Sequence, residues 1–338
     1  MQPLTVRRIL WVCGWLTLLL LAVVVIALKL GASPIPIVDV VMTLARGAFG
    51  QLERIPSEYR LIVFDLRLPR IALGILVGAA LSVSGASFQA LLRNPLADPY
   101  VLGVSSGAAL GAIVALIAFP HVPLAMQALA FAGAGLTIAA VYFLGRRGGQ
   151  LDSPTLLLAG IVSASFLSAV IMFLMTTLSG RDLRGMAFWL MGDLTSAPPI
   201  HLGFLFVVVV FASGAIYTTA SDLNLILTGE QEARHLGVNV GRVKIVVYVA
   251  ASLLVGIAVS VSGAIGYVGL LIPHVMRMLF GSDYRLLIPT SAIGRAIAIV
   301  VADTLARSIV APIELPVGAM TAVAGAPVFI YLLRRRLR

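Results

Sequence analysis

Long apolar runs, broken by short polar segments, follow one another along almost the whole chain. A helix needs roughly 20 apolar residues to cross the ~30 Å hydrocarbon core of a bilayer, and most of the runs reach that length. We count ten, at residues 9–29, 70–91, 99–119, 124–144, 154–178, 200–220, 243–264, 268–281, 287–310 and 317–333. The pattern predicts ten membrane-spanning helices.

The eighth run, at residues 268–281, is shorter than the others and contains Pro273. Interrupted backbone is tolerated at membrane depth only where protein or a water-filled path covers it. We therefore expect a partial or re-entrant helix among its neighbours, in a place where a transport path runs.

The chain also contains an internal repeat. Residues 75–86 read ILVGAALSVSGA and residues 253–264 read LLVGIAVSVSGA, which agree at nine of twelve positions. The two segments lie in the second and the seventh predicted spans, with four spans between them, so they cross the membrane in opposite directions. Inverted halves of this kind are typical of membrane transport proteins. We expect two inverted repeats of five helices, at about residues 1–190 and 195–338, within a single domain.

Composition agrees with an all-α polytopic membrane protein. The 338 residues are 60% hydrophobic and 11% charged, with a mean hydropathy of +1.06, and a soluble globule of this size needs a far more polar exterior. The first run is too long for a signal-peptide core and lacks a cleavage site, which predicts a retained helix. The single cysteine, Cys13, lies inside it. We expect no disulfide framework and no bound metal.

Basic residues predict the orientation, because Lys and Arg beside membrane spans stay in the cytoplasm. An even number of spans places both termini on one side. That side receives 14 of the 24 basic residues, namely Arg7, Arg8, Arg93, Arg146, Arg147, Arg234, Arg242, Lys244, Arg277, Arg285, Arg334, Arg335, Arg336 and Arg338. It is therefore the predicted cytoplasmic side, and the net charge of +10 needs no nucleic acid to explain it.

Two polar segments and one glycine pattern stand out. Gly103, Gly107 and Gly111 recur every four residues, which favours close helix packing over a direct substrate role. The segment RNPLADPYVLGVSSGA, from Arg93, has two prolines that predict a non-helical crossing at the cytoplasmic rim. The segment TGEQEARHLGV, at residues 228–238, predicts a short amphiphilic helix with Thr228 and Gln231 as a capping box. It suits docking to a soluble partner, and an ordinary solvated loop helix is the alternative.

The chain carries no signature of an ATP-hydrolysing site. A phosphate-binding loop needs Gly-Lys followed by Ser or Thr, and neither lysine, Lys29 or Lys244, follows a glycine. The GVSSG sequence at residues 103–107 matches the nucleophile pattern of hydrolases, but it lies in an apolar helical run. We expect a translocating protein and no enzyme.

Eight ordered motifs resemble the permeases of bacterial type II ABC importers for ferric siderophores, haem and cobalamin. They are RLPR (67–70), VSGA (83–86), RNPLADPYVLGVSSGA (93–108), LLLAG (156–160), EARHLGV (232–238), GYVGLLIPH (266–274), ADTLAR (302–307) and ELPVGAMTAVAGAPVFIYLL (314–333). The resemblance implies a homodimer in the bacterial inner membrane with both termini in the cytoplasm. It also implies two ATPase subunits that bind ATP and magnesium, a periplasmic binding protein, and no cofactor on this chain.

The resemblance further implies roles for individual residues. An ATPase-coupling helix would use Glu230, Glu232, Ala233, Arg234, His235, Leu236 and Gly237. Binding-protein docking would use Arg67, Arg70 and Arg307, whose alternative role is to anchor helix ends at the membrane edge. A cytoplasmic gate would contain Asn94, Leu96, Ser153 and Pro154. The path would be lined by Met172, Met175, Thr176 and Thr177, for which ordinary packing is the alternative.

Arg295 departs from the family pattern, because similar sequences usually carry a small residue there. It lies in the middle of the ninth predicted span, where an arginine costs about 2.5 to 3.5 kcal/mol unless it faces protein or water. We expect its side chain to point inward, toward an interior partner or an anionic substrate, with snorkelling in a crevice as the alternative. Asp303 is about 12 Å further along the helix, too far for a direct pair.

The expected cargo is an iron chelate, and cobalamin is the alternative within the same family. An ion-coupled secondary transporter also suits inverted repeats, but it should carry buried carboxylates. Asp303 alone lies inside a predicted span.

Overall fold

The computed structural model describes residues 4–95, 97–148, 150–178, 180–195, 200–266 and 268–336. Over these residues the protein is helical, apart from a short antiparallel ladder in which β1 (Arg146–Arg147) pairs with β2 (Gln150–Leu151). Arg146 lies opposite Leu151 in that ladder. The predicted all-α polytopic architecture is confirmed.

Each of the ten predicted spans coincides with a helix. They are α1 (Val6–Lys29), α4 (Leu68–Leu91), α5 (Val104–Ala118), α6 (Ala125–Leu144), α7 (Ser153–Met175), α9 (Ile200–Thr218), α12 (Val240–Ser262), α13 (Val268–Phe280), α14 (Tyr284–Ala306) and α15 (Val317–Arg336). Within the described residues six helices are long and apolar enough to cross a membrane alone. A bent pair, α9 with α10 (Ala220–Thr228), meets the same criterion when its two halves are taken together as one span, with a 49° bend between them. The remaining α5, α13 and α15 are shorter apolar helices.

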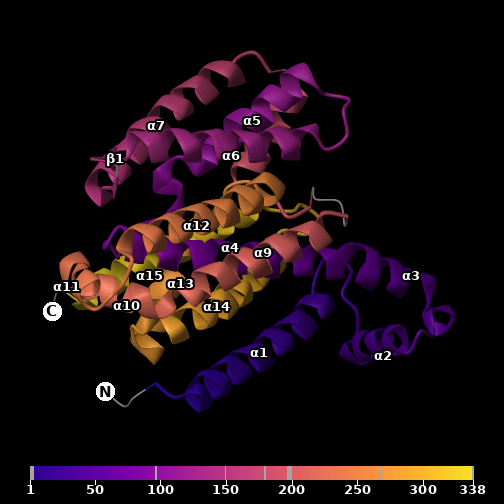
Figure 1. Cartoon of the computed structure of the whole chain (residues 1–338). Helices are drawn as coiled ribbons and strands as arrows, with labels where there is room; N and C mark the ends of the chain where they lie inside the picture. Colours follow the sequence, from indigo (N-terminus) through magenta and orange to yellow (C-terminus); the bar gives the residue numbers. More distant parts are fainter. Residues whose placement is uncertain are drawn as a thin grey trace.

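Several short helices lie outside the predicted spans. They are α2 (Ile37–Ala48), η1 (Leu52–Arg54), α3 (Ser57–Arg60), the π-helical η2 (Leu61–Arg67), α8 (Gly180–Leu190) and α11 (Glu230–His235). A further short helix, η3 (Pro99–Leu102), begins the third predicted span, before α5. The first four connect α1 to α4, and η2 continues directly into α4. In Figure 1, α2 and α3 lie at one end of the bundle, and both termini, β1 and α11 lie toward the opposite end. This arrangement agrees with an even number of crossings.

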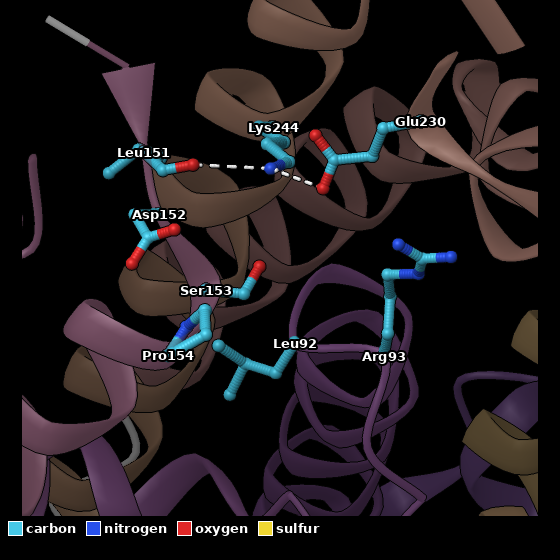
Figure 2. A pocket seen from close by; sticks show the side chains of 8 residues that line it. All are labelled: Leu92, Arg93, Leu151, Asp152, Ser153, Pro154, Glu230 and Lys244. Carbon is cyan, nitrogen blue, oxygen red and sulfur yellow. Dashed lines mark hydrogen bonds and ion pairs between the residues drawn. The ribbon is translucent and has the colours of Figure 1, made fainter. Parts of the chain in front are cut away.

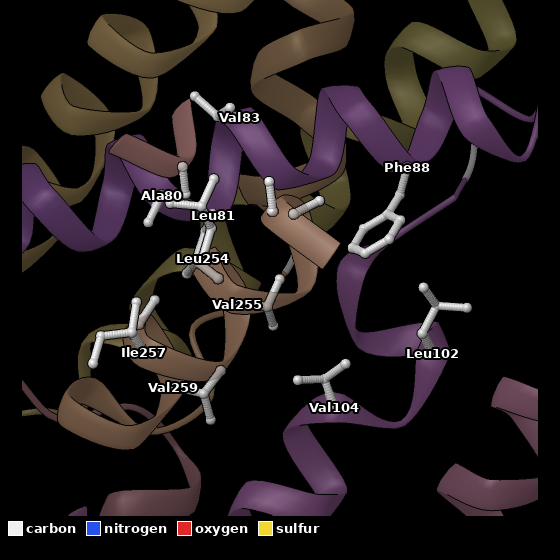
Figure 3. Packing of buried hydrophobic residues seen from close by; sticks show 14 of the residues in the cluster. Ala80, Leu81, Val83, Phe88, Leu102, Val104, Leu254, Val255, Ile257 and Val259 are labelled. Carbon is white, nitrogen blue, oxygen red and sulfur yellow. The ribbon is translucent and has the colours of Figure 1, made fainter. Parts of the chain in front are cut away.

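The two copies of the internal repeat form the centre of the bundle. They belong to α4 and α12, which pack against each other and have most of their residues buried. Ala80 and Leu81 of α4 lie close to Leu254 and Val255 of α12 (Figure 3). Figure 1 places α5, α6 and α7 on one side of this centre and α1 on the other. The sequence repeat is therefore the most buried part of the fold, and the division into halves at residues 190 and 195 stays a prediction.

Helices α5 and α6 approach so closely that their contact excludes side chains. A Cβ atom added to Gly111 would overlap the carbonyl oxygen of Leu129, and one added to Gly133 would overlap the carbonyl oxygen of Gly107. Gly103 has a φ of 76° and ends η3 just before α5 begins. The packing role predicted for the glycines of α5 is confirmed.

The crossing between α4 and α5 is non-helical until η3, as its prolines predict. Asp98 begins η3 by accepting a hydrogen bond from the backbone N–H of Tyr100 at 2.8 Å. Asn94 continues the turn, since its N–H donates to the carbonyl of Gln89 at 3.1 Å and its carbonyl accepts from Ala97 at 3.0 Å. Leu96, a predicted gate residue, lies outside the described residues.

Candidate functional site

The predicted coupling helix is present as α11, six residues long, between two glycines with positive φ. Gly229 has a φ of 157° and Gly237 a φ of 87°. The predicted capping box is wrong: Thr228 is the last residue of α10, and its hydroxyl donates to the carbonyl of Leu225 at 2.8 Å. Because the preceding helix engages that hydroxyl, Gly229 takes the N-cap position with no side-chain cap.

The residues of α11 and its C-terminal turn divide between two faces. Glu232, Arg234, His235, Leu236 and Gly237 are exposed, and Leu236 keeps 66% of its surface accessible. An exposed leucine among charged residues suits a partner's cleft. Ala233 is buried and Glu230 turns toward the bundle. The predicted docking residues therefore include two that face the protein interior.

A cavity of about 640 Å³ lies beside α11 at the same end of the bundle. Its lining brings the two predicted gate segments together with the coupling helix (Figure 2), and consists of Leu92, Arg93, Leu151, Asp152, Ser153, Pro154, Glu230 and Lys244. The Ser153 hydroxyl donates to the carbonyl of Leu91, at the end of α4, at 2.9 Å. Asp152 caps α7 by accepting from the N–H of Thr155 at 3.1 Å.

Lys244 is a residue of this site that the sequence argument missed. Its ammonium lies 2.7 Å from a carboxylate oxygen of Glu230 and donates to the carbonyl of Leu151 at 3.1 Å. The available signal was a lysine inside an otherwise apolar predicted span. Lysine is almost never fully buried without a partner, so that position required one.

The three arginines predicted to dock a binding protein come together at the other end of the bundle and are buried, or nearly so, in the chain. Arg70 pairs with Asp303 at 2.8 Å and with Glu314 at 2.7 Å. Arg307 lies 3.5 Å from the second oxygen of Asp303 and donates to the carbonyl of Ala27. Their guanidinium groups are therefore engaged within this chain.

Arg67 completes this cluster by fixing the end of α1. Its guanidinium donates to the carbonyls of Leu28 and Ser33. Gly31, whose φ is 148°, lies against both Arg67 and Arg307, since an added Cβ would stand 2.9 Å from Nη2 of Arg67 and 3.2 Å from Nη1 of Arg307. The positive φ of this residue favours a glycine in the turn after α1, and the two guanidinium groups pack against it.

Arg295 points into the protein, as predicted, and is fully buried. Its Nη2 atom donates to the carbonyl of Ile265 at 2.9 Å, just before α13. Tyr100 holds the same residue, because its hydroxyl accepts from the N–H of Ile265 at 3.0 Å and donates to its carbonyl at 3.1 Å. Burial raises the pKa of Asp98, and the nearby Arg295 charge acts in the opposite direction. An interior partner is thus found for Arg295, and the substrate role stays a prediction.

The predicted path residues lie at the C-terminal end of α7. Met172 keeps 71% of its surface exposed and Met175 is half-buried. The hydroxyls of Thr176 and Thr177 donate to backbone carbonyls three residues earlier, each at 2.6 Å. Much of the apolar surface of α7 is left uncovered within a single chain.

These features define a polytopic permease, in which a bundle of apolar helices carries a short helix, α11, beside a polar cavity. The model of the FecCD transport family matches residues 19–335, and the chain belongs to this family. It is the multi-pass permease subunit of an ABC transporter, and membership in the family implies ATPase and binding-protein partners. ATP hydrolysis is not the work of this chain.

Two curated relatives and one solved structure cover most of the chain. The cobalamin import system permease BtuC of Halobacterium salinarum is 43% identical over 282 residues, 83% of this chain and 76% of its own. The hemin transport system permease HmuU of Yersinia pestis is 40% identical over 286 residues, 81% and 84% respectively. An inward-facing structure of a metal-chelate type ABC transporter matches with a TM-score of 0.82 at 30% identity, over 96% of this chain and 99% of the other.

Proposed function

We propose that this chain is the translocation subunit of an ATP-driven importer that carries an iron chelate, a siderophore complex or haem, from a periplasmic binding protein to the cytoplasm. It works as a homodimer with two ATPase subunits in the bacterial inner membrane, with both termini in the cytoplasm. The ATPase subunits bind ATP and magnesium.

The observation that carries this proposal is the position of α11 beside the polar cavity. Its exposed face offers Glu232, Arg234 and Leu236 to a partner, and its other face contributes Glu230 to the lining shared with Ser153 and Pro154. A displacement of α11 by the ATPase therefore reaches the gate segments over a short distance. This arrangement suits a transporter that is driven by a partner outside its own chain.

The iron-chelate cargo is supported by two of the comparisons. HmuU is named for hemin transport, and a Bacillus subtilis relative, 37% identical over 280 residues, is named for import of Fe(3+)-citrate. Cobalamin is the second candidate, because the Halobacterium relative named for it is at least as similar. The exposed face of α7, with Met172 and Phe166, supplies apolar surface suited to a second copy of the chain or to a bulky chelate.

The outer arginine cluster supports docking of an acidic binding protein by exchange of partners. Glu314 is 49% exposed and holds Arg70 from the solvent side. An exposed pair of this kind contributes about 0 to 1 kcal/mol. An acidic group of a binding protein can therefore replace Glu314 on Arg70 at little cost, while Asp303 keeps the guanidinium in place.

The experiment that tests the cargo is to identify the ligand of the cognate binding protein. We expect that protein, purified from cells, to hold a ferric siderophore or haem, and to bind detergent-solubilised permease with its ATPase. Binding of cobalamin with no affinity for iron chelates would replace the proposed cargo with the second candidate.

A further inference from the structure

Neither the helix position of Lys244 nor its burial favours a charged lysine there. It lies near the beginning of α12, which starts at Val240 and is capped by Asn239. The N-terminal end of a helix carries a partial positive charge that disfavours a cation. The side chain is also buried, which costs hydration of the ammonium. Its partners must therefore account for its presence.

The two partners of Lys244 come from two different segments (Figure 2). Glu230 is the first residue of α11 and holds the ammonium at 2.7 Å. Leu151 belongs to β2 and accepts a hydrogen bond from the ammonium at 3.1 Å. One side chain thus joins the docking helix α11, the spanning helix α12 and the turn that leads into α7.

The turn at Leu151, Asp152 and Ser153 connects Lys244 to the predicted gate segments. Leu151 is followed by Asp152, which caps α7, and by Ser153, which donates to the carbonyl of Leu91 at the end of α4. Arg93 and Asn94 come next along the chain from α4. Polar contacts, joined by short stretches of the chain, therefore connect α11 through Lys244 to both predicted gate segments.

The length of α11 and the glycines beside it explain why the contact between Glu230 and Lys244 matters for movement of this helix. A helix of six residues has little stability of its own, and its flanking residues Gly229 and Gly237 both have positive φ. Such glycines allow α11 to tilt as a unit. The tilt then reaches the rest of the protein through the inward-facing contacts of α11, and Glu230 makes a charged contact of this kind.

We propose that Lys244 is a positioning residue that transmits the displacement of α11 to the turn at Leu151, Asp152 and Ser153, and so couples ATP hydrolysis to opening of the gate. This inference rests on the proposed function, since it uses the coupling helix and the gate. It adds a specific residue through which the two are connected.

The test measures transport and ATP hydrolysis together in the complete complex in proteoliposomes. Lys244→Met is expected to lower the substrate moved per ATP by about 10-fold, while ATP hydrolysis stays near the wild-type rate. Lys244→Arg keeps both contacts and retains coupling. The matched control is Arg242→Met, an exposed cation two residues earlier on the same helix, which should behave as wild type.

A double-mutant cycle separates transmission from simple stabilisation. Glu230→Gln with Lys244→Met should be no worse than Lys244→Met alone, because both remove the same link. The exchange Glu230→Lys with Lys244→Glu restores opposite charges but presents a carboxylate to the Leu151 carbonyl, and should stay uncoupled. Additive losses, or full rescue by the exchange, would overturn the proposal.

A spectroscopic readout makes the test independent of the cargo. Spin labels at Gln231 on α11 and Leu158 on α7, both exposed, should change their separation when the ATPase binds nucleotide, and this change should be lost in Lys244→Met. If the wild-type complex carries no iron chelate but shows the label response, the proposed cargo fails and the inference stands. If Lys244→Met does not assemble, Glu230→Gln takes its place, and an unchanged label response there refutes the inference.

Discussion

The Nε atom of Arg70 lies 2.8 Å from one carboxylate oxygen of Asp303, and this ion pair joins the N-terminal end of α4 to the C-terminal end of α14. Arg307 lies 3.5 Å from the other oxygen. Asp303 is therefore held between two buried cations, and Arg70 has a second, exposed partner in Glu314. The two carboxylates that contact Arg70 differ in burial, and this difference leads to the first two predictions.

Asp303→Asn should destabilise the protein by about 3 kcal/mol, because it leaves the buried guanidinium group of Arg307 without its counter-charge and leaves Arg70 with Glu314 alone. Glu314→Gln is the matched control, since it removes an exposed pair to the same arginine and should cost at most about 1 kcal/mol. Denaturant unfolding of detergent-solubilised protein compares them. Equal losses of unfolding free energy in the two variants would show that burial of Asp303 does not determine how much its ion pairs stabilise the protein.

Glu314→Gln should raise the affinity for the binding protein by about 2- to 5-fold, because it frees Arg70 for an acidic partner. The joint charge reversal Arg67→Glu with Arg70→Glu should weaken docking strongly. Both effects are read from binding isotherms at low and physiological salt, since exposed charges are screened. If the double variant binds the binding protein with unchanged affinity at physiological salt, these arginines are not part of the docking surface.

Gly111→Val should abolish correct packing of α5 on α6, because its side chain would overlap the backbone at Leu129. Forced overpacking costs about 1 to 3 kcal/mol or more. Gly135→Val on α6 is the control, since an added Cβ there meets nothing within 4 Å. Monodispersity and thermal stability in detergent measure both variants, and a stable Gly111→Val would contradict the close approach.

Arg295→Met should change the pH dependence of stability through Asp98. Burial raises the pKa of Asp98 in the folded protein and Arg295 opposes that rise, so loss of the arginine raises the folded pKa further. A raised folded pKa means that the folded state binds the proton more tightly. The associated stability is present at low pH and is lost as pH rises through the folded pKa.

The variant should therefore lose more stability than wild type between mildly acidic and neutral pH. Adding Asp98→Asn to Arg295→Met should abolish this additional loss of stability with rising pH. Parallel pH profiles for wild type and Arg295→Met, measured by thermal unfolding, would show that the two groups do not interact. Normal uptake by Arg295→Gly would separately discard a substrate role for this residue.

Apolar run length predicted the spanning helices because a bilayer fixes the length of an apolar helix. The same criterion missed α2, whose twelve residues mix apolar and charged side chains, and α10, which continues a span beyond a bend. The capping-box prediction was wrong because the Thr228 hydroxyl can bond either to the helix that follows it or to the helix that precedes it. In the structure it donates to the carbonyl of Leu225 in the preceding helix, α10. Local sequence could not decide between them.

Among the site residues, the sequence placed α11 and the gate segments but not their connection. Lys244 and Leu151 are 93 positions apart, and Arg70 and Asp303 are 233 apart. Such pairs depend on how helices pack, which no local pattern encodes. The inward direction of Arg295 was predictable, because an unshielded charge inside a bilayer is too costly, whereas its partner Ile265 was not.

The central claim is tested most directly by uptake into proteoliposomes that contain this chain and its ATPase, with the loaded binding protein outside. The account predicts accumulation of a radiolabelled iron chelate that requires both ATP and the binding protein, and none when the ATPase cannot hydrolyse ATP. Accumulation that proceeds without ATP under an ion gradient, or that is confined to cobalamin, would contradict it.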